Sequence, residues 1–283
     1  MAEVPRTPFA SRMSHAVGWL ADRRVPTLLR TPVYATYCLF TGADASEAQL
    51  PRKRYPSLSA FFVRRLRDGA RPLDADPRAL LSPCDGTLQS LDRIDDGTLL
   101  QAKGRSYPLA ELLAGAGDDV DLDGATAWTI YLGPRDYHRV HSPIDGELSE
   151  VRWIAGARYS VHPRVLSKRA RVLSVNERAV LRLETPGGPW FLVMVGAMNV
   201  GRIRVVGVEQ GATPERPLSF RRGDELARFE MGSTVVLVAP RGLADAAGDL
   251  TPEQTLRLGA RIGSLPTSVG TDALLSNAPD GGA

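Results

Sequence analysis

The sequence predicts an α+β protein in which N-terminal amphipathic helices are followed by a mainly β domain of sandwich or barrel-like type. Before residue 70, apolar residues and arginines recur at helical spacing. After it, short runs rich in β-branched residues alternate with Gly, Pro and Asp, which is typical of strands joined by turns. We therefore divide the chain into a helical segment, residues 1–70, and a β domain, residues 71–283.

The composition is that of an ordinary globular protein, with 43% hydrophobic and 24% charged residues among 283. Cys38 and Cys84 form neither a metal pattern nor a disulfide framework. The chain has no glycine-rich phosphate loop, which argues against a nucleotide enzyme, and we expect no nucleic-acid partner. We also expect no signal peptide and no transmembrane span, because Pro26 and Pro32 interrupt the N-terminal apolar part.

The N-terminal segment is basic, with 11 Lys or Arg against 5 Asp or Glu in residues 1–70, a net charge of +6. Between residues 9 and 40, aromatic and aliphatic residues alternate with arginines, a pattern that suits the plane of an anionic membrane surface. Helices that cover the protein's own core would have the same pattern, and both interpretations stay open. A second apolar and basic stretch of helical spacing spans residues 58–66.

Seven β-prone runs follow, at residues 87–91, 127–132, 148–154, 179–183, 190–195, 203–208 and 234–239. The turn sequence Ser-Pro-Cys-Asp-Gly at residues 82–86 has an echo, Ser-Pro-Ile-Asp-Gly, at residues 142–146. Near the C-terminus we expect a helix over residues 252–262 and disorder over residues 276–283.

The last β-prone run begins at a Gly-Ser bond, Gly232-Ser233. Because glycine has no side chain to shield its carbonyl, the Ser233 hydroxyl can approach the carbonyl carbon of Gly232. This is the geometry of an N-to-O acyl shift, the first step by which a chain can cleave itself. The alternative interpretation is a pair of small residues that merely opens a strand.

Two of the four histidines, His138 and His141, lie three residues apart just after a predicted strand. We expect no metal there, because neither H-E-x-x-H nor a cysteine pair is present. Asp85 and Asp145 each precede a glycine, which is also a normal turn choice. Together with Ser233, one such aspartate and one histidine could form a Ser-His-Asp arrangement.

Five motifs run through most of the chain. They are Ser82-Pro83-Cys84-Asp85-Gly86, Gln101-Ala102-Lys103-Gly104, Pro134-Arg135-Asp136-Tyr137-His138-Arg139-Val140-His141, Val195-Gly196-Ala197 and Met231-Gly232-Ser233-Thr234, with Phe61-Phe62-Val63-Arg64-Arg65-Leu66-Arg67 before them. In these motifs and in their order, the chain resembles the bacterial phosphatidylserine decarboxylases, and the stretch before them is similar too.

The resemblance implies a proenzyme that cuts itself between Gly232 and Ser233 and converts Ser233 into a pyruvoyl group. Asp85, His141 and Ser233 would form the self-cleavage triad, and His138 would act in decarboxylation. The pyruvoyl group would form a Schiff base with the substrate amine and take the place of pyridoxal phosphate as electron sink. The reaction would convert phosphatidylserine into phosphatidylethanolamine and carbon dioxide.

The resemblance further implies a heterodimer of the two cleavage fragments, which could dimerise further. From the basic charge and the interleaved apolar residues of the N-terminal segment we expect peripheral attachment to the cytoplasmic side of the cell membrane. The sequence departs from the family's pattern at Met231, where Leu is common, and at Ala227, where Gly is frequent. Two alternatives remain. One is a membrane-associated serine hydrolase, although the chain has no G-x-S-x-G motif, and the other is a membrane-binding β domain without activity.

Overall fold

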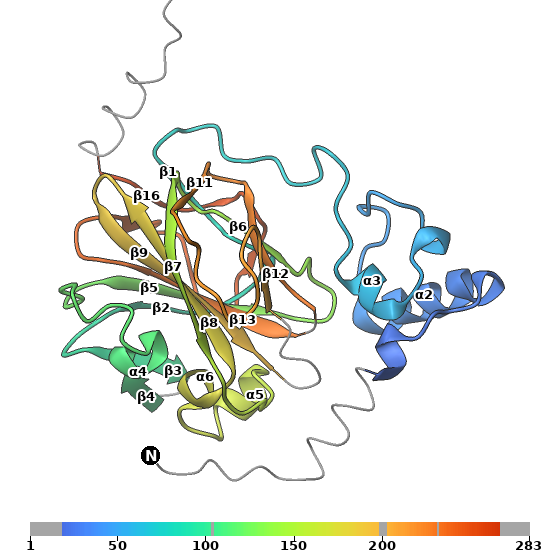
Figure 1. Ribbon diagram of the computed structural model, residues 1–283, viewed down its shortest axis with the longest axis horizontal. Helices are drawn as coiled ribbons and strands as arrows, with labels where there is room; N and C mark the ends of the chain where they lie inside the picture. The colour runs from blue at the N-terminus through green and yellow to red at the C-terminus, as the bar shows by residue number, and fades with distance from the viewer. Residues whose placement is uncertain (1–18, 103–104, 198–202, 231, 267–283) are drawn as a thin grey trace, which may run out of the picture.

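The centre of the fold is an eight-stranded antiparallel sheet of order β11-β7-β8-β9-β13-β5-β2-β15 (Figure 1). The structure is a computed structural model that describes residues 19–102, 105–197, 203–230 and 232–266. The strands of this sheet are β2 (Gly86–Arg93), β5 (Thr126–Leu132), β7 (Gly146–Ile154), β8 (Arg178–Thr185), β9 (Gly188–Gly196), β11 (Leu218–Phe220), β13 (Ser233–Ala239) and β15 (Thr255–Leu256).

Strand β13 lies in the interior of this sheet and pairs with β9 on one side and β5 on the other. All of its residues are buried. Its sequence is continuously apolar after Thr234 because both faces of the sheet are covered, so neither set of alternating side chains meets water. In this register Ser233, the first residue of β13, lies opposite Leu132 and Gly196.

Two three-stranded sheets cover one face of the large sheet, and a layer of short helices with the two-stranded sheet β3-β4 covers the other. One core cluster joins Trp128, Leu181 and Leu192 of the large sheet to side chains of the small sheets, among them Val140 and Leu226. The second cluster lies on the other face, beneath the helical layer. The small sheets have the orders β10-β12-β6 and β1-β16-β14. Their strands are β1 (Ala79–Leu81), β6 (Arg139–His141), β10 (Ile203–Val205), β12 (Glu225–Phe229), β14 (Asp245–Ala246) and β16 (Arg261–Ser264). The helical layer contains the helices α4 (Leu109–Leu113), α5 (Pro163–Leu166) and α6 (Val172–Val175), and beside them lies the two-stranded sheet of β3 (Thr98–Ala102) and β4 (Arg105–Pro108).

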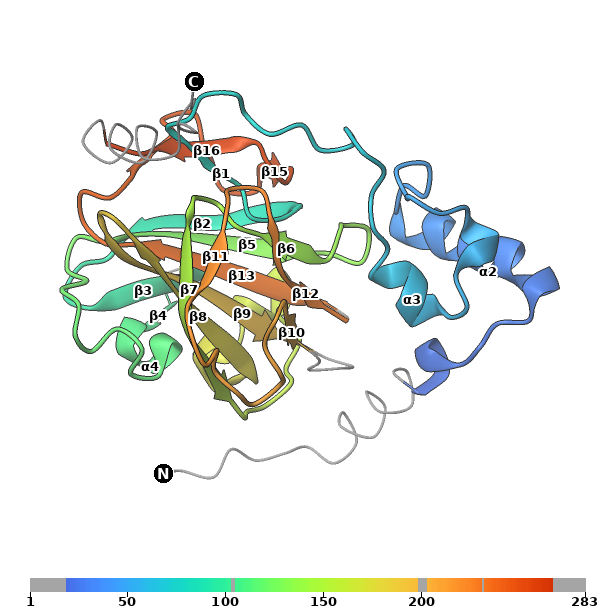
Figure 2. The same ribbon diagram turned by 45° about the horizontal axis from the view of Figure 1, so that its top comes forward.

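The N-terminal helices lie beside the β body rather than within it (Figures 1 and 2). They are α2 (Thr27–Thr41), the 3₁₀ turn η1 (Arg52–Arg54) and α3 (Leu58–Phe62). Helix α2 ends at Gly42, which takes a left-handed conformation (φ +77°) and donates its N–H to the Cys38 carbonyl. Tyr34 of α2 stacks on Phe61 of α3, with the ring centroids 5.0 Å apart. In the part of the chain that is described, no helix combines the length and apolarity needed to span a bilayer.

The echoed turn sequence forms two similar turns, each of which leads into a strand of the large sheet. The hydroxyls of Ser82 and Ser142 each donate to the carbonyl two residues further on, at 2.8 and 2.6 Å. A Cβ on Gly86 or Gly146 would lie 2.6 or 2.8 Å from a backbone carbonyl oxygen of a neighbouring strand, which only glycine avoids. The aspartates differ, because Asp85 is buried whereas its counterpart in the second turn is exposed.

The structure confirms that the chain is mainly β, and each of the seven predicted runs lies wholly or partly in a strand. The helix predicted over residues 252–262 is wrong, because this stretch forms turns and the strands β15 and β16. Its helix-forming residues are overruled by pairing with β2 and β1 and by Gly259 at φ +82°. The domain boundary at residue 70 and the membrane-facing role of the helices stay predictions. Residues 276–283 and the apolar residues before Trp19 lie outside the described residues.

Candidate active site

Ser233 and His138 meet at the edge of the large sheet where β5 ends and β13 begins. After Leu132 the chain leaves β5, makes a turn at residues 133–137 and returns as β6. This turn brings His138 Nδ1 to 3.5 Å from Ser233 Oγ, and both side chains are fully buried. The two residues are 95 positions apart in sequence, so the contact depends on the pairing of β13 with β5.

The His138 ring is held in one tautomer by its second nitrogen. Nε2 lies 2.9 Å from the carbonyl oxygen of Gly133, which can only accept a hydrogen bond, so Nε2 carries the proton. Nδ1 is therefore unprotonated and faces Ser233 as an acceptor. Burial lowers the pKa of His138 to about 3, although the bond to Gly133 opposes the shift, and the ring is neutral at physiological pH.

The N-terminal segment forms one wall around this histidine. The ring of Phe62, from α3, lies 4.0 Å from the His138 ring between centroids. The Arg139 guanidinium donates to the Val63 carbonyl at 2.9 and 3.1 Å. In addition, the Tyr37 hydroxyl of α2 donates to the Pro134 carbonyl at 2.6 Å. The chain around His138 thus contacts both N-terminal helices, α2 through Pro134 and α3 through His138 itself.

His141 lies in the same region but has other partners. Its Nδ1 donates to the Gly223 carbonyl at 2.7 Å, which leaves Nε2 as an acceptor. The Tyr137 hydroxyl donates to that nitrogen at 3.3 Å. Burial lowers the pKa of His141 as well. The structure therefore brings His138, and not His141, into contact with Ser233.

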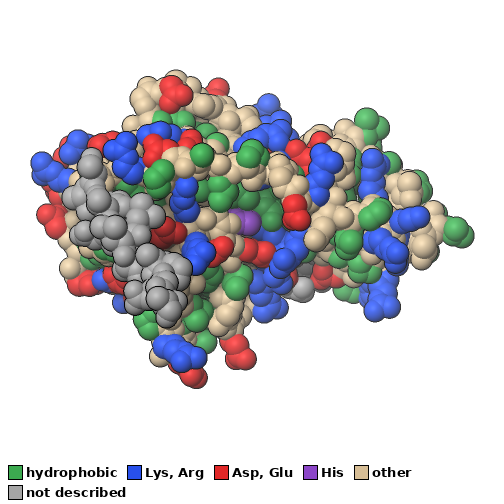
Figure 3. Space-filling view, turned by 90° about the horizontal axis from the view of Figure 1, so that it is seen from above, with side chains coloured by type: hydrophobic (Ala, Val, Ile, Leu, Met, Phe, Trp, Pro, Cys, Tyr) green, Lys and Arg blue, Asp and Glu red, His purple; other side chains and the backbone are tan. Residues whose placement is uncertain are grey.

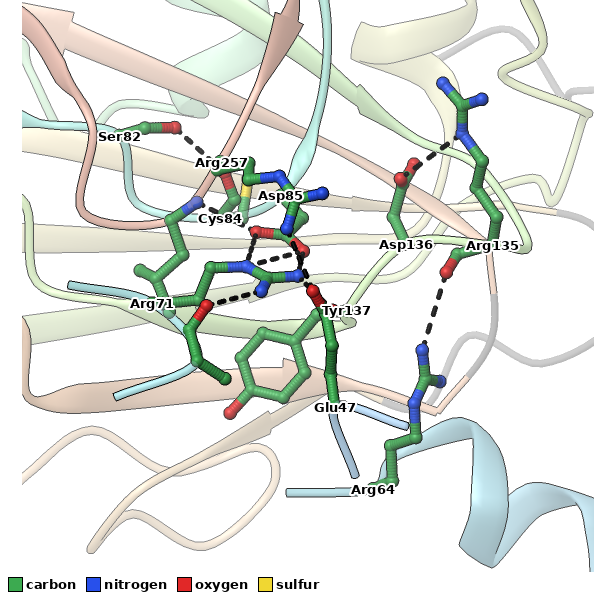
Figure 4. A network of polar contacts seen from close by, with 12 residues as sticks. Glu47, Arg64, Arg71, Ser82, Cys84, Asp85, Arg135, Asp136, Tyr137 and Arg257 are labelled. Atoms are coloured by element: carbon green, nitrogen blue, oxygen red, sulfur yellow. Dashed lines mark hydrogen bonds and ion pairs between the residues drawn. The ribbon is translucent and has the colours of Figure 1, made fainter. Parts of the chain in front are cut away.

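Asp85 belongs to a separate ionic network (Figure 4). Arg71 donates to both of its carboxylate oxygens, with the shortest contact at 2.6 Å, and to Glu47 at 2.7 Å. Arg257 also binds Glu47, and the Leu258 N–H donates to Asp85 at 2.8 Å. Asp85 thus connects the part of the chain before Gly232 to the part after it. Among the described contacts, none links Asp85 to His141.

A cavity of about 200 Å³ opens next to Ser233. Its lining is mostly apolar, and it combines residues of the N-terminal helices with residues of the β domain. They are Ala21, Tyr37, Leu58, Ser59, Phe62, Tyr131, Leu132, Pro134, Ser160, Val161, His162, Ala197, Gly232 and Ser233. Apart from its chain neighbours, no described residue has an atom within 4 Å of the position that a Cβ on Gly232 would take, so the described part of the chain leaves open space beside the peptide bond before Ser233. Within the described ranges, no three His, Cys, Asp or Glu side chains are grouped closely enough to hold a metal ion.

Comparison with protein families shows what kind of enzyme this site belongs to. The model of the family "Phosphatidylserine decarboxylase" matches residues 58–264, which include both histidines, Asp85 and the Gly232-Ser233 bond. The chain belongs to the phosphatidylserine decarboxylase family. It is a decarboxylase, and the family resemblance predicted from the motifs is confirmed.

Curated members of the phosphatidylserine decarboxylase family match over most of their length. The phosphatidylserine decarboxylase proenzyme of Xanthomonas campestris pv. campestris (strain B100) is 42% identical over 233 residues, which cover 78% of this chain and 83% of that protein. The proenzyme of Hahella chejuensis is 36% identical over 276 residues, which cover 92% of this chain and 91% of that protein. The proenzyme of Marinobacter nauticus is 36% identical over 267 residues, 89% of this chain and 93% of that protein.

Three residues that adjoin the predicted site were not found from the sequence. Phe62 lies in the N-terminal stretch that is similar to the family, but nothing in the sequence around it indicates that its ring packs on His138. Arg71, which binds Asp85, stands in a linker outside all the motifs. Gly133 follows a strand and precedes a proline, which indicates a turn but not that its carbonyl fixes a histidine tautomer.

The burial of neutral His138 predicts a specific pH dependence of stability. The unfolded chain binds a proton at this residue below about pH 6.5, but the folded chain does so only near its lowered pKa of about 3. Stability is therefore complete above pH 6.5 and is lost as the pH falls toward 3, by up to about 1.4 kcal/mol per pH unit from this residue.

Urea unfolding of a Ser233→Ala chain should be compared with that of the Ser233→Ala/His138→Gln chain between pH 3 and 8. The Ser233→Ala background keeps both proteins as single uncut chains. As the pH falls from 6.5 to 3, the free energy of unfolding should decrease less for the glutamine variant. Above pH 6.5, the plots of this free energy against pH should be parallel for the two proteins. Parallel curves over the whole range would contradict the buried neutral state.

Proposed function

We propose that this chain is a self-processing phosphatidylserine decarboxylase that cuts itself at Gly232-Ser233 and works with a pyruvoyl group derived from Ser233. The family and the proenzyme names of its relatives support the proposal. The observation that carries it is the buried contact between Ser233 Oγ and an unprotonated ring nitrogen of His138, at a bond with open space beside it. The comparisons give no support to the serine hydrolase alternative.

The uncut chain provides what the first step of cleavage needs. His138 Nδ1 can accept the proton of the Ser233 hydroxyl as the oxygen attacks the Gly232 carbonyl carbon. The separation of 3.5 Å is long for an O–H···N bond, so the side chains must approach by a few tenths of an ångström. The resemblance assigns this proton transfer to His141, whose Nε2 would first have to leave the Tyr137 hydroxyl.

The residues around Ser233 also fit a pyruvoyl group at this position. Such a group supplies the electron sink that α-decarboxylation of an amino acid requires. Residue 233 borders a cavity that admits a ligand, and the lining of that cavity is mostly apolar, which limits the access of water to the reacting carbon. His138 lies beside this residue and is placed to exchange a proton with a group bound there.

We propose that the two cleavage fragments stay together as a heterodimer. The smaller fragment would begin with β13, which pairs with β9 and β5 of the larger one along its whole length or nearly so. A cut at the first residue of this strand breaks one covalent bond and none of the strand's pairing. Arg257 and Leu258 would add contacts to Glu47 and Asp85 of the larger fragment.

Histidine variants test the assignment of the chemistry. If His141 takes the Ser233 proton, as the resemblance implies, His141→Ala should stay largely uncut; if His138 takes it, as the contact in the uncut chain indicates, His141→Ala should still cut. His138→Ala should cut more slowly, because Ser233 loses its neighbouring acceptor, and the fraction that does cut should release little carbon dioxide. A denaturing gel with intact mass should detect fragments of residues 1–232 and 233–283, the latter without a free N-terminal amine. If His138→Ala were cut at the wild-type rate, the contact between His138 and Ser233 would have no role in cleavage. Active enzyme that remains one full-length chain would contradict the proposal as a whole.

We further propose that the chain attaches peripherally to the cytoplasmic side of the cell membrane through its N-terminal helices. Large apolar side chains on and before α2 are exposed, including Leu28, Leu39 and Phe40, which are 81–92% exposed. Arginines accompany them, and the space-filling view shows apolar and basic side chains side by side over this end of the molecule (Figure 3). Each basic residue near anionic lipid contributes about 1 kcal/mol, screened by salt.

Binding to vesicles tests this attachment. The double variant Leu39→Gln/Phe40→Gln should lower the partition onto vesicles of anionic lipid about a hundredfold or more, because each of the two side chains loses an apolar contact worth about 1.5–3 kcal/mol. Leu73→Gln is the matched control, since Leu73 is exposed but lies outside the N-terminal helices. Co-sedimentation should also weaken as salt rises. Equal binding by the double variant and the control would contradict attachment through α2.

A further inference from the structure

The part of the cavity lining that comes from the β domain contains a short polar stretch, Ser160 and His162, just before α5. His162 is the N-cap of that helix, and its Nδ1 accepts the N–H of Arg164 at 3.2 Å. The His162 N–H in turn donates to Ser160 Oγ at 3.2 Å. The two side chains are therefore oriented by the backbone, and they are the polar groups that this stretch offers to the cavity.

Both side chains keep a proton that no described residue accepts. Because Nδ1 of His162 accepts from a backbone N–H, the ring proton is on Nε2. No hydrogen bond from this Nε2–H, or from the Ser160 hydroxyl, to another described residue is found. The ring of His162 is steadied by an edge contact with Tyr131, at 5.8 Å between centroids. Ser160 is half-buried and His162 is exposed, so two donors that no described residue uses lie on the solvent-facing part of a mostly apolar lining.

The chemistry of the substrate indicates what these donors bind. In phosphatidylserine the hydroxyl oxygen of the serine headgroup is one of the ester oxygens of a phosphodiester anion. When the amino group of this serine reaches residue 233, the phosphodiester lies a few bonds away, toward the mouth of the cavity. An anion against an apolar lining is stable only where hydrogen-bond donors replace its water. We propose that His162, together with Ser160, binds the phosphodiester of the headgroup, an inference that rests on the proposed function.

The capping role of His162 allows a sharp pair of substitutions. Asparagine and aspartate are equally good N-cap residues, so His162→Asn and His162→Asp both keep the acceptor for the Arg164 N–H. Only asparagine keeps an N–H donor, whereas aspartate places a negative charge beside the anion. A difference between the two variants therefore reports on ligand recognition and not on the stability of α5.

The experiment measures carbon dioxide release from dihexanoyl phosphatidylserine, supplied as monomer so that vesicle binding plays no part. For His162→Asp we expect KM to rise about tenfold or more, as for loss of a hydrogen bond to a charged group, with kcat changed far less. His162→Asn should stay within about twofold of wild type in both constants. Intact mass should find all variants cut to the same extent.

Lys168→Gln is the control for diffuse charge, since Lys168 is exposed on the same segment and does not line the cavity. Its KM should stay within about twofold of wild type. Equal KM values for His162→Asp and His162→Asn, or a rise for Lys168→Gln as large as for His162→Asp, would overturn the assignment. Failure of the proposed function would look different, because the cut wild-type protein would then release no carbon dioxide from this substrate.

Discussion

The position of the His138 ring is the constraint on which the rest of the site depends. The Gly133 carbonyl fixes its tautomer, Phe62 covers its face, and burial keeps it neutral. With the proton on the far nitrogen, the nitrogen that faces Ser233 can only accept. A serine hydroxyl has little tendency to lose its proton, so a neutral ring nitrogen held next to it as an acceptor is the feature that makes this serine chemically distinct.

The same contacts connect the N-terminal helices to the chemistry. Helix α2 presents Tyr37 to the turn that carries His138, while Leu39 and Phe40, two and three residues further along, are exposed. Helix α3 contributes Phe62 to the cavity wall. The surface proposed to meet lipid and the wall of the cavity are therefore parts of one short segment. A lipid held at that surface would have its headgroup close to the cavity while its acyl chains remained outside it.

The parts of this account that could be predicted from the sequence are those encoded by local pattern. The continuous apolar run after Thr234 identifies a strand buried on both faces, and the Gly-Ser bond and the histidine pair indicate the groups that we propose to react. The helix expected over residues 252–262 was wrong because its residues favour a helix locally, whereas pairing with β1 and β2 is a long-range interaction.

The contacts within the site were beyond sequence reasoning for the same reason. Asp85 binds Arg71 and the Leu258 N–H, 14 and 173 positions away, and nothing in the local sequence distinguishes this carboxylate from one that binds a histidine. Likewise, His138 and His141 lie three residues apart, and nothing in their neighbouring residues shows which of them reaches Ser233. Only the return of the chain after β5 decides which of them reaches Ser233.

The central claim is that His138 faces Ser233 as a neutral ring with its proton on Nε2. Nitrogen NMR of the uncut Ser233→Ala chain, labelled with ¹⁵N in its histidine rings and assigned with the His138→Gln variant, tests it directly. At pH 6 the account predicts a neutral His138 ring with a proton on Nε2 and none on Nδ1. A doubly protonated ring at that pH, or a proton on Nδ1, would contradict it.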